Sequence, residues 1–594
     1  MTANTINSLQ TSIISGELPL SRLVKDIGRK IDQQQPEIWI HRVCEADLLD
    51  RAAELDALAQ QYGNALLKAL PLYGVPFAVK DNIDVAGLPT TAACAEFSYL
   101  AQQDAFVVRR LLDAGAILIG KTNLDQFATG LVGVRSPYGI VRNAIDPRRV
   151  AGGSSSGSAV AVATGLVAFS LGTDTAGSGR IPAGFNGVVG LKPSRGLFSG
   201  SGVVPACMTL DCVSIFATDV AGAWQVAQVM AAYDDQDGRS RRVAMAPVRR
   251  RHRRVAIPAD CEFFGDQQAA DAFAAALDTL RRQPDIIFSK VPFAVFAEAA
   301  ALLYEGPWVA ERRVAIDDFY RNRPEAIHPV VRGIIANGDK FSAAQAFSSR
   351  YRLDDLTRQA QRLLAETDLL LVPTAPCMPT IDEVLAEPVR VNAQLGYYTN
   401  FVNLMDMAAL AMPATPRADG LPAGITLIGP AGADHLLAET AAAWQGLFNG
   451  ADQSDVISAQ PLTFNEPVVE VAVVGAHLQG EPLNWQLIEG GARKMAETTT
   501  APAYRLYALS GTKPAKPGLV RVAEQGESIA LELWQMPLRH FGSFVAAVPP
   551  PLGIGTVELA DGRLVKGFIC EPAGLTNAVD ITAFKGWRAY RAAV

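Results

Sequence analysis

Three polar residues, Lys80, Ser154 and Ser178, lie in three separate glycine-containing segments of the 594-residue chain. A serine hydroxyl is a poor nucleophile until a neighbouring group accepts its proton. No histidine occurs in either serine segment, residues 152–158 or 172–180, so another side chain must be the base. The residue types therefore point to a serine nucleophile served by a lysine.

Lys80 follows the apolar run 74–79, which has the pattern of a short buried strand. A lysine accepts a proton at neutral pH only if its pKa lies near 7 rather than at about 10.4, and burial lowers the pKa of an amine. We therefore expect Lys80 to be buried and to act as the base. Ser154 would pass the proton between Lys80 and Ser178.

The glycines around Ser178 suit a second task. Small residues let the backbone approach a ligand closely, so we expect the N–H groups of Thr175, Ala176, Gly177 and Ser178 to form an oxyanion hole. A Gly/Ser-rich stretch can also be a flexible linker or a phosphate-binding loop. No lysine follows the glycines as it does in a P-loop, and the flanking stretches are apolar, so the catalytic interpretation is favoured.

At these motifs the chain resembles the amidase signature family, whose members cleave carboxamides with a Ser-Ser-Lys triad. The resemblance covers roughly residues 65–430. It implies that Ser178 is the nucleophile, Ser154 the bridging serine and Lys80 the terminal base. It also implies an α/β/α core with a mixed sheet, and chemistry without a metal or an organic cofactor.

Strand-like and helical stretches alternate from residue 74 to about residue 210, which predicts an α/β fold for the main part of the chain. The expected parts are a helical N-terminal segment (1–64), an amidase signature domain (65–450), a linker (451–466) and a small α+β, β-rich C-terminal domain (467–594). Strands of the last domain are expected at residues 468–474, 503–509, 528–534 and 564–570.

Composition limits the class of protein. Hydrophobic residues make up 49% of the chain and the net charge is −7, which favours a globular enzyme over a general nucleic-acid surface. The basic run at residues 249–254 is the exception, and we interpret it as a solvated connector. Seven cysteines without CxxC pairs indicate neither a disulfide framework nor a zinc site. With no signal sequence and no membrane-length apolar run, we expect a cytoplasmic protein.

Two further segments, residues 123–139 and 304–313, resemble those of allophanate hydrolases within the same family. Allophanate is urea carrying a carboxylate, so its site needs a fixed cation, for which an arginine is suited. Tyr304 and Arg312 are eight residues apart, which predicts that they share one helix face and converge on one ligand. The resemblance implies that both contact the substrate.

Some alternatives stay open for these contacts. Arg313 is a second candidate for the cation, and Tyr304 and Arg312 could instead be solvated surface residues. Gly130 is expected to offer backbone groups to the substrate amide.

Residues 473–484 and 499–507 resemble the γ-glutamylcyclotransferase-like fold and the extra domain of long allophanate hydrolases. Cyclotransferases use a glutamate shortly after a strand like Glu532-Leu533-Trp534, but no acid follows here, so the resemblance does not carry over that activity. His477 is the candidate acid or base of a second site, where a product of the first reaction would lose carbon dioxide. A purely structural histidine is the alternative.

The resemblance implies hydrolysis of allophanate to ammonia and carbon dioxide. It also implies a homodimer and a biotin-dependent urea carboxylase that supplies the substrate, with no nucleic acid or membrane as partner. The alternatives are a broad or malonamate-type amidase, the amidase subunit of a tRNA-dependent amidotransferase, and an assembly protein with a vestigial triad. The acidic balance and the appended domain disfavour the amidotransferase, and the complete triad disfavours a vestigial site.

Overall fold

The computed structural model describes residues 5–243, 245, 253–449 and 468–593. The chain divides into two compact units, and the division falls between α18 (Asp434–Asn449) and β14 (Val468–Val473). The N-terminal helices belong to the first unit. The linker expected at residues 451–466 and most of the basic run lie outside the described residues.

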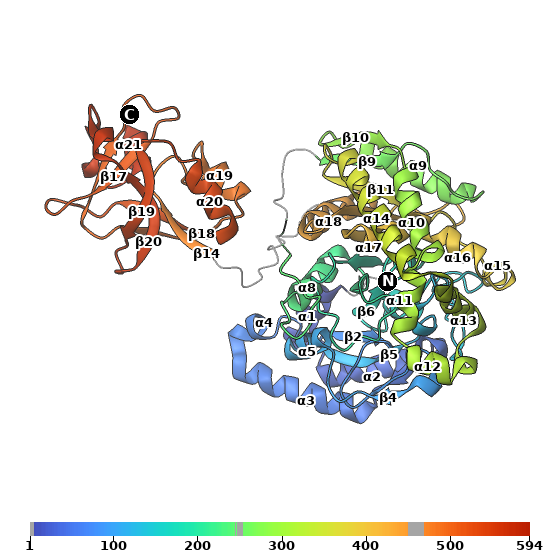
Figure 1. Ribbon diagram of the computed structural model, residues 1–594. Coiled ribbons are helices and arrows are strands. Elements are labelled where there is room, and N and C mark those ends of the chain that lie inside the picture. Colours follow the sequence, from blue (N-terminus) through green and yellow to red (C-terminus); the bar gives the residue numbers. More distant parts are fainter. Residues whose placement is uncertain (1–4, 244, 246–252, 450–467, 594) are drawn as a thin grey trace. The chain divides into compact units, whose positions relative to one another are not determined.

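An eleven-stranded mixed sheet forms the centre of the first unit (Figure 1). Its order is β1-β5-β2-β6-β8-β7-β12-β13-β11-β9-β10. The strands are β1 (Trp39–Arg42), β2 (Pro76–Lys80), β5 (Ile117–Thr122), β6 (Phe169–Asp174), β7 (Val189–Lys192), β8 (Cys212–Ala217), β9 (Arg253–Pro258), β10 (Ile286–Val291), β11 (Leu369–Pro373), β12 (Met407–Pro413) and β13 (Gly424–Pro430). Strand β2 runs parallel to β5 and β6, whereas β8 is antiparallel to β6 and β7. The expected α/β fold with a mixed sheet is confirmed.

Helices surround this sheet, and the segment between β10 and β11 is helical as expected. The longer ones are α1 (Ile6–Ile14), α2 (Leu20–Ile31), α3 (Glu45–Tyr62), α5 (Phe106–Asp113), α6 (Ser156–Ala163), α8 (Val220–Met230), α9 (Gln267–Arg281), α10 (Ala294–Glu305), α13 (Pro329–Ala336) and α14 (Ala343–Leu363). The shorter ones are α4 (Leu66–Ala69), α7 (Ile181–Asn186), α11 (Trp308–Val314), α12 (Asp317–Asn322), α15 (Ile381–Ala386), α16 (Arg390–Leu395) and α17 (Asn400–Leu404).

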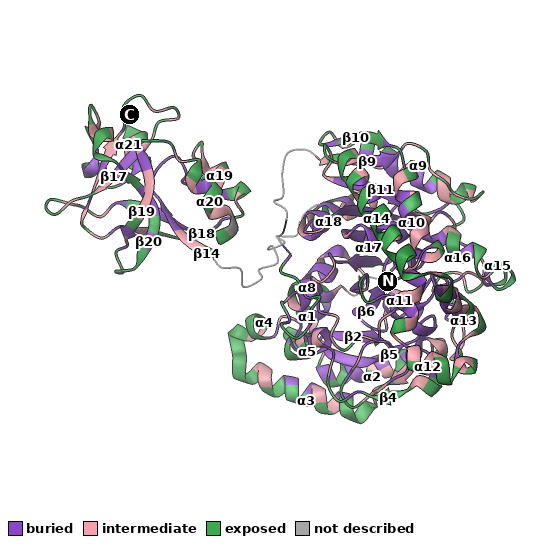
Figure 2. Ribbon diagram, in the orientation of Figure 1, coloured by how far each residue is buried: buried purple, intermediate pink, exposed green. Residues whose placement is uncertain are grey.

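Strands β2, β5 and β6 are buried at every residue, as the purple strands of Figure 2 show. A strand buried on both faces has a nearly continuous apolar sequence, and this is why the run before Lys80 contains no polar residue. The polar residues that these strands carry to their ends, Lys80 and Asp174, are consequently held in the interior.

The N-terminal segment contains a strand that the helical pattern does not predict. Strand β1 pairs antiparallel with β5, with Trp39 opposite Thr122. It has only four residues and no clear alternation of polar and apolar side chains, so its sequence carries little strand signal. The expected helices on either side are present as α1, α2 and α3.

The second unit contains a five-stranded sheet, β15-β18-β14-β20-β19, and a three-stranded sheet, β17-β16-β21. Its further elements are β15 (Arg493–Thr499), β16 (Tyr504–Ala508), β17 (Pro517–Arg521), β18 (Ala530–Pro537), β19 (Leu552–Glu558), β20 (Leu564–Cys570), β21 (Val579–Asp580), α19 (Asn484–Glu489), α20 (Leu538–Ala546) and α21 (Trp587–Ala593). The four expected strands correspond to β14, β16, β18 and β20. The expected β-rich C-terminal domain is confirmed.

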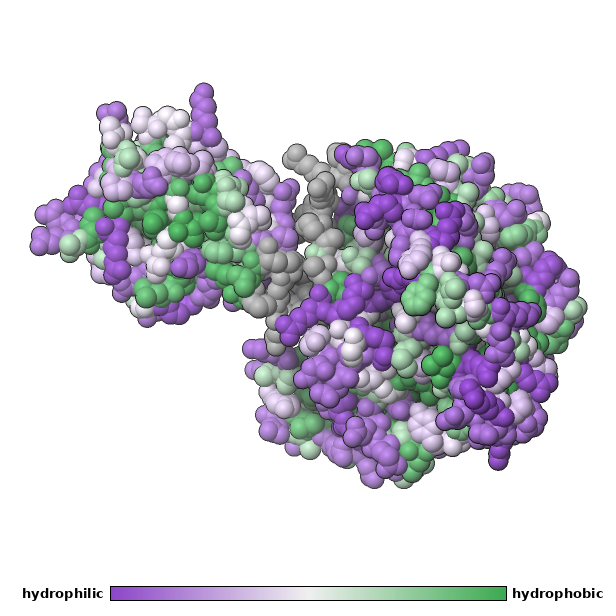
Figure 3. Space-filling view, viewed as in Figure 1, coloured by the Kyte–Doolittle hydropathy of each residue, from purple (hydrophilic) through white to green (hydrophobic). Residues whose placement is uncertain are grey.

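Hydrophilic and hydrophobic side chains are mixed over the visible face of the first unit (Figure 3). Among the described residues, no helix is both long enough and apolar enough to span a bilayer.

Candidate active site

Lys80 is the last residue of β2 and is completely buried. Its Nζ lies 2.8 Å from Oγ of Ser154 and 2.8 Å from Oγ1 of Thr173. Burial lowers the pKa of Lys80 to about 7, and the nearby carboxylate of Asp125 opposes this shift. The amine is therefore divided between its neutral and charged forms at neutral pH, which is the condition expected of a lysine base.

Ser154 lies just before α6, and the Gly153–Ser154 peptide bond is cis. A Cβ on Gly153 would meet the carboxylate of Asp125 and the backbone nitrogen of Gly133, so only glycine fits at this position. The carbonyl of Ser154 accepts a hydrogen bond of 3.0 Å from the N–H of Asp125. These contacts fix the serine hydroxyl against Lys80.

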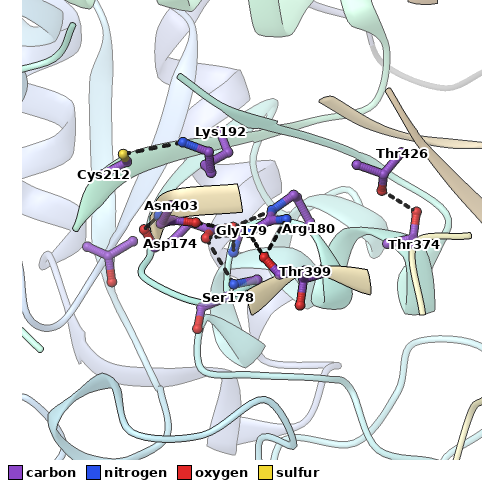
Figure 4. Close-up of polar contacts among 12 residues, drawn as sticks. Asp174, Ser178, Gly179, Arg180, Lys192, Cys212, Thr374, Thr399, Asn403 and Thr426 are labelled. Carbon is purple, nitrogen blue, oxygen red and sulfur yellow. Dashed lines mark hydrogen bonds and ion pairs between the residues drawn. The ribbon is translucent and has the colours of Figure 1, made fainter. Parts of the chain in front are cut away.

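Ser178 lies in the turn between β6 and α7 (Figure 4) and is 2% exposed. Its hydroxyl contacts the carbonyl of Gly130 at 3.5 Å. Both serines belong to the described part of the chain, yet no hydrogen bond joins the hydroxyls of Ser178 and Ser154. The structure thus contains the Lys80–Ser154 link of the expected relay, and the second link needs the Ser178 hydroxyl to move away from Gly130.

A buried ion pair holds the turn that carries Ser178. Two nitrogens of Arg180, Nε and Nη2, each lie 2.9 Å from the carboxylate of Asp174, as Figure 4 shows. The same carboxylate accepts the N–H groups of Gly177 at 2.9 Å and Gly179 at 3.0 Å. Asn403 completes the cluster by donating to the carbonyl of Asp174 at 2.7 Å. The backbone on both sides of Ser178 is therefore fixed from one carboxylate.

Asp174, Arg180 and Asn403 are not among the functional residues predicted from the sequence. Burial raises the pKa of Asp174, but the charge of Arg180 outweighs this effect and holds that pKa below its usual value. A signal is present for the first two, because opposite charges flank the serine turn within one motif. Asn403 comes from a distant helix, α17, and has no such signal.

The expected oxyanion hole differs in one donor. The N–H of Gly177 points to Asp174 and is not available to a substrate. Within the described residues, the N–H groups of Thr175, Ala176 and Ser178 have no hydrogen-bond partner. The side-chain hydroxyl of Thr175 donates to the carboxylate of Asp211. Three of the four expected donors are therefore free to receive a substrate oxygen.

Tyr304 and Arg312 do not share one helix, contrary to the prediction. Tyr304 belongs to α10 and Arg312 to α11, and the chain turns between them at Gly306 and Pro307. The side chains nevertheless meet, with Nη2 of Arg312 3.4 Å from the Tyr304 hydroxyl and the guanidinium 5.2 Å from the ring centroid. Proline and glycine interrupt the helix, so the eight-residue spacing does not have the geometry of two continuous turns.

Arg312 is the buried member of the arginine pair. It is 3% exposed, donates to Oγ1 of Thr129 at 3.1 Å, and its Nε has no hydrogen-bond partner among the described residues. Arg313 instead forms ion pairs with Asp317 and Asp339 nearer the surface. This placement favours Arg312 over Arg313 as the cation of the site.

Gly130 lies between the arginine and the nucleophile. Its neighbour Thr129 contacts Arg312, and its own carbonyl contacts Ser178. The carboxylate of Asp125 holds the surrounding loop by accepting the N–H groups of Val132 at 3.2 Å and Gly133 at 3.0 Å. The structure therefore brings the predicted triad and the predicted substrate contacts into one buried site.

His477 lies in the second unit and lines a cavity of about 170 Å³. Its Nε2 is 2.8 Å from Oε1 of Gln486, and its ring stacks on Phe568 with centroids 4.6 Å apart. Lys513 and Lys516 line the same cavity. Burial lowers the pKa of His477, so the ring is neutral at neutral pH. A neutral imidazole beside two ammonium groups can take up a proton and donate it to a bound anion.

Within the described residues, no group of three or more His, Cys, Asp and Glu side chains is arranged to hold a metal ion.

Comparison with known proteins gives the family. The amidase family matches residues 22–438, and the allophanate hydrolase C-terminal domain matches residues 469–592. Urea amidolyase of Saccharomyces cerevisiae is 46% identical over 574 residues, which are 93% of this chain and 31% of that protein. This chain thus spans about a third of the length of the curated relatives that it matches first.

Two further comparisons support the same grouping. A solved structure of Kluyveromyces lactis allophanate hydrolase is 41% identical, with a TM-score of 0.84, and each chain covers 99% of the other. A solved structure of the peptide amidase from Stenotrophomonas maltophilia is 27% identical with a TM-score of 0.64, and the match covers 75% of this chain and 97% of that one. The chain belongs to the amidase family and carries an allophanate hydrolase C-terminal domain after its amidase domain.

Proposed function

We propose that this chain hydrolyses allophanate through an acyl-enzyme on Ser178. The observation that carries the proposal is the buried guanidinium of Arg312, whose Nε has no partner among the described residues and which contacts the residue next to Gly130. An unpartnered buried donor is costly, and a ligand carboxylate would satisfy it. The similarity to a solved allophanate hydrolase, over 99% of both chains, supports the same substrate.

The chemistry begins with the neutral form of Lys80. Its amine takes the proton of Ser154, whose oxygen takes the proton of Ser178 as the Ser178 oxygen attacks the terminal carboxamide carbon. Negative charge then develops on the carbonyl oxygen, where the free N–H groups of the turn, those of Ala176 and Ser178 among them, stabilise it. The substrate carboxylate, held at Arg312 and Tyr304, fixes which carbonyl faces the nucleophile.

Collapse of the tetrahedral intermediate breaks the C–N bond. The proton stored on Lys80 returns through Ser154 to the leaving nitrogen, and ammonia departs. Water then attacks the ester, again with Lys80 as base, and releases N-carboxycarbamate while the Ser178 hydroxyl is restored. Loss of carbon dioxide from this dicarboxylate, followed by breakdown of carbamate, gives the final ammonia and carbon dioxide.

The alternatives fit the site less well. A broad amidase has no use for a buried arginine beside the nucleophile with a donor left unpaired. Glutamyl-tRNA(Gln) amidotransferases are relatives of the amidase domain, whereas the second unit here matches the allophanate hydrolase C-terminal domain. Supply of allophanate by a biotin-dependent urea carboxylase and assembly as a homodimer complete the proposal.

A substrate panel tests this proposal. Ammonia release should be fast with allophanate and slow with malonamate, acetamide and biuret. Arg312→Gln should raise KM for allophanate while leaving the slow rate on acetamide unchanged, because acetamide has no carboxylate. Arg313→Gln is the matched control and should behave as wild type. Equal rates on allophanate and acetamide would contradict the substrate assignment but leave the amidase mechanism intact.

The cavity around His477 favours a second function, decarboxylation of N-carboxycarbamate. Two lysines and a neutral histidine at one cavity suit a small dicarboxylate, and the histidine can supply the proton that replaces carbon dioxide on nitrogen. We propose that Lys513 and Lys516 bind the two carboxylates. A structural histidine, packed against Phe568 and Phe544, is the alternative.

Carbon dioxide release by the full-length chain separates the two roles of His477. His477→Ala should slow carbon dioxide release while the first ammonia still appears at the wild-type rate. Lys516→Gln should have the same effect, and Lys585→Gln, at a surface ion pair with Glu527, is the control. Unchanged carbon dioxide release in His477→Ala would leave only the structural role.

A further inference from the structure

Residues 206–211, which we call the brace, connect two parts of the site that are distant in the sequence. At one end the partly buried Asp211 accepts a hydrogen bond from the hydroxyl of Thr175 in the turn before Ser178. The same carboxylate accepts the N–H groups of Ala206 at 2.7 Å and Cys207 at 3.2 Å. Asp211 therefore ties the oxyanion turn to the backbone of the brace.

The other end of the brace is attached to α11, the helix that carries Arg312. Glu311 accepts two hydrogen bonds from Thr209, one from its N–H at 2.6 Å and one from its hydroxyl at 2.8 Å. The thiol of Cys207 also lies 3.5 Å from the carbonyl of Trp308. The turn that would stabilise the oxyanion and the helix that would bind the carboxylate are thus linked through one short segment.

Several charged groups lie near Asp211. Burial raises the pKa of Asp211 to about 6, and the charge of Arg312 acts in the opposite direction. Asp211 is accordingly ionised at neutral pH and above, where it raises the pKa of Lys80 together with Asp125 and Asp174. A cavity of about 280 Å³ borders Asp211, and its other charged lining residues are Arg195, Arg239, Arg241 and Asp237.

We propose that Asp211 is a positioning residue for the hydrolysis. Through Thr175 it holds the oxyanion turn in its donor geometry, and through the brace it fixes that turn relative to Arg312. This role rests on the proposed acyl-enzyme chemistry at Ser178. Because the oxyanion exists only in the transition state, a loosened turn lowers kcat and leaves KM nearly unchanged.

The test is Asp211→Asn in the full chain, with allophanate as substrate. We expect kcat to fall about tenfold or more, since a charged hydrogen bond is lost, and KM to change less than about twofold. The acid limb of the pH–rate profile should move to lower pH, because a carboxylate that raises the pKa of Lys80 is removed. A purely structural aspartate would not move this limb.

Asp237→Asn is the matched control. Asp237 is also buried, borders the same cavity and accepts backbone N–H groups, from Gly200 at 2.8 Å and Arg239 at 2.9 Å. Its hydrogen bonds and ion pair within the described residues reach neither Thr175 nor α11, so kcat and the acid limb should stay at their wild-type values.

Thr175→Val removes the same hydrogen bond from the other side and decides the matter if Asp211→Asn does not fold. It should lower kcat with unchanged KM, and the double variant should be no slower than the slower single variant. Wild-type kcat in either single variant overturns the role of Asp211. An inactive wild-type chain would instead count against the proposed function itself.

Discussion

At the scale of residues, the proposed chemistry depends on the buried amine of Lys80. Its pKa is lowered to about 7 by burial, and only the neutral form can accept the proton that starts the reaction. We therefore expect kcat/KM for allophanate to rise with pH through about 7 and then level off. A pH–rate profile measures this directly, and a rate that stays constant from about pH 6 to about pH 8 would contradict a lysine base.

The same shift predicts an effect on stability. Because the pKa of Lys80 is lower in the folded chain than in the unfolded chain, its burial costs stability at pH values below about 7, and this cost disappears as the pH rises toward the unfolded value. Lys80→Met should be inactive and yet more stable than wild type by about 3 kcal/mol at neutral pH. Urea unfolding at neutral and alkaline pH should show this difference shrinking as the pH rises.

At the scale of elements, the turn between β6 and α7 depends on the ion pair of Asp174 and Arg180. Asp174→Asn leaves the buried guanidinium unpaired, so it should lower the free energy of unfolding by about 3–5 kcal/mol and abolish activity. Chemical unfolding and ammonia release measure the two effects. Asp278→Asn is the control, since its pair with Arg281 is exposed and should contribute less than about 1 kcal/mol.

A glycine gives a second prediction for this turn. Gly177 has φ +134°, and a Cβ at this position would meet the side chain of Thr399. Gly177→Ala should therefore shift the turn and lower kcat about 100-fold, the loss typical for one oxyanion donor. Gly165→Ala, where a Cβ would meet no atom within 4 Å but φ is also positive, controls for backbone strain alone. Equal losses in both variants would assign the effect to strain.

How far the sequence can predict these elements depends on the range of the contacts. The triad lies within short motifs, and the apolar run before Lys80 by itself predicts a buried strand. Gly306 and Pro307 mark a break in the sequence, but the way it brings Tyr304 against Arg312 depends on the packing of two helices. Asn403 reaches Asp174 across 229 residues, a contact that no local pattern encodes.

At the scale of the whole molecule, the triad, the turn and the candidate substrate contacts all belong to the first unit, while His477 belongs to the second. Each unit has its own hydrophobic core. A chain ending at Asn449 should therefore fold and release the first ammonia from allophanate, while N-carboxycarbamate accumulates. Separate assays of ammonia and carbon dioxide check this, and wild-type carbon dioxide release by the shortened chain would contradict a decarboxylation site in the second unit.

The most direct test of the central claim is ammonia release from allophanate by the full chain and by its Ser178→Ala variant. The assay is best made at about pH 8, where Lys80 is mostly neutral. We predict rapid release by the wild type and none above the uncatalysed rate by the variant, with thermal unfolding confirming that the variant is folded. Equal release by the two proteins would contradict an acyl-enzyme on Ser178.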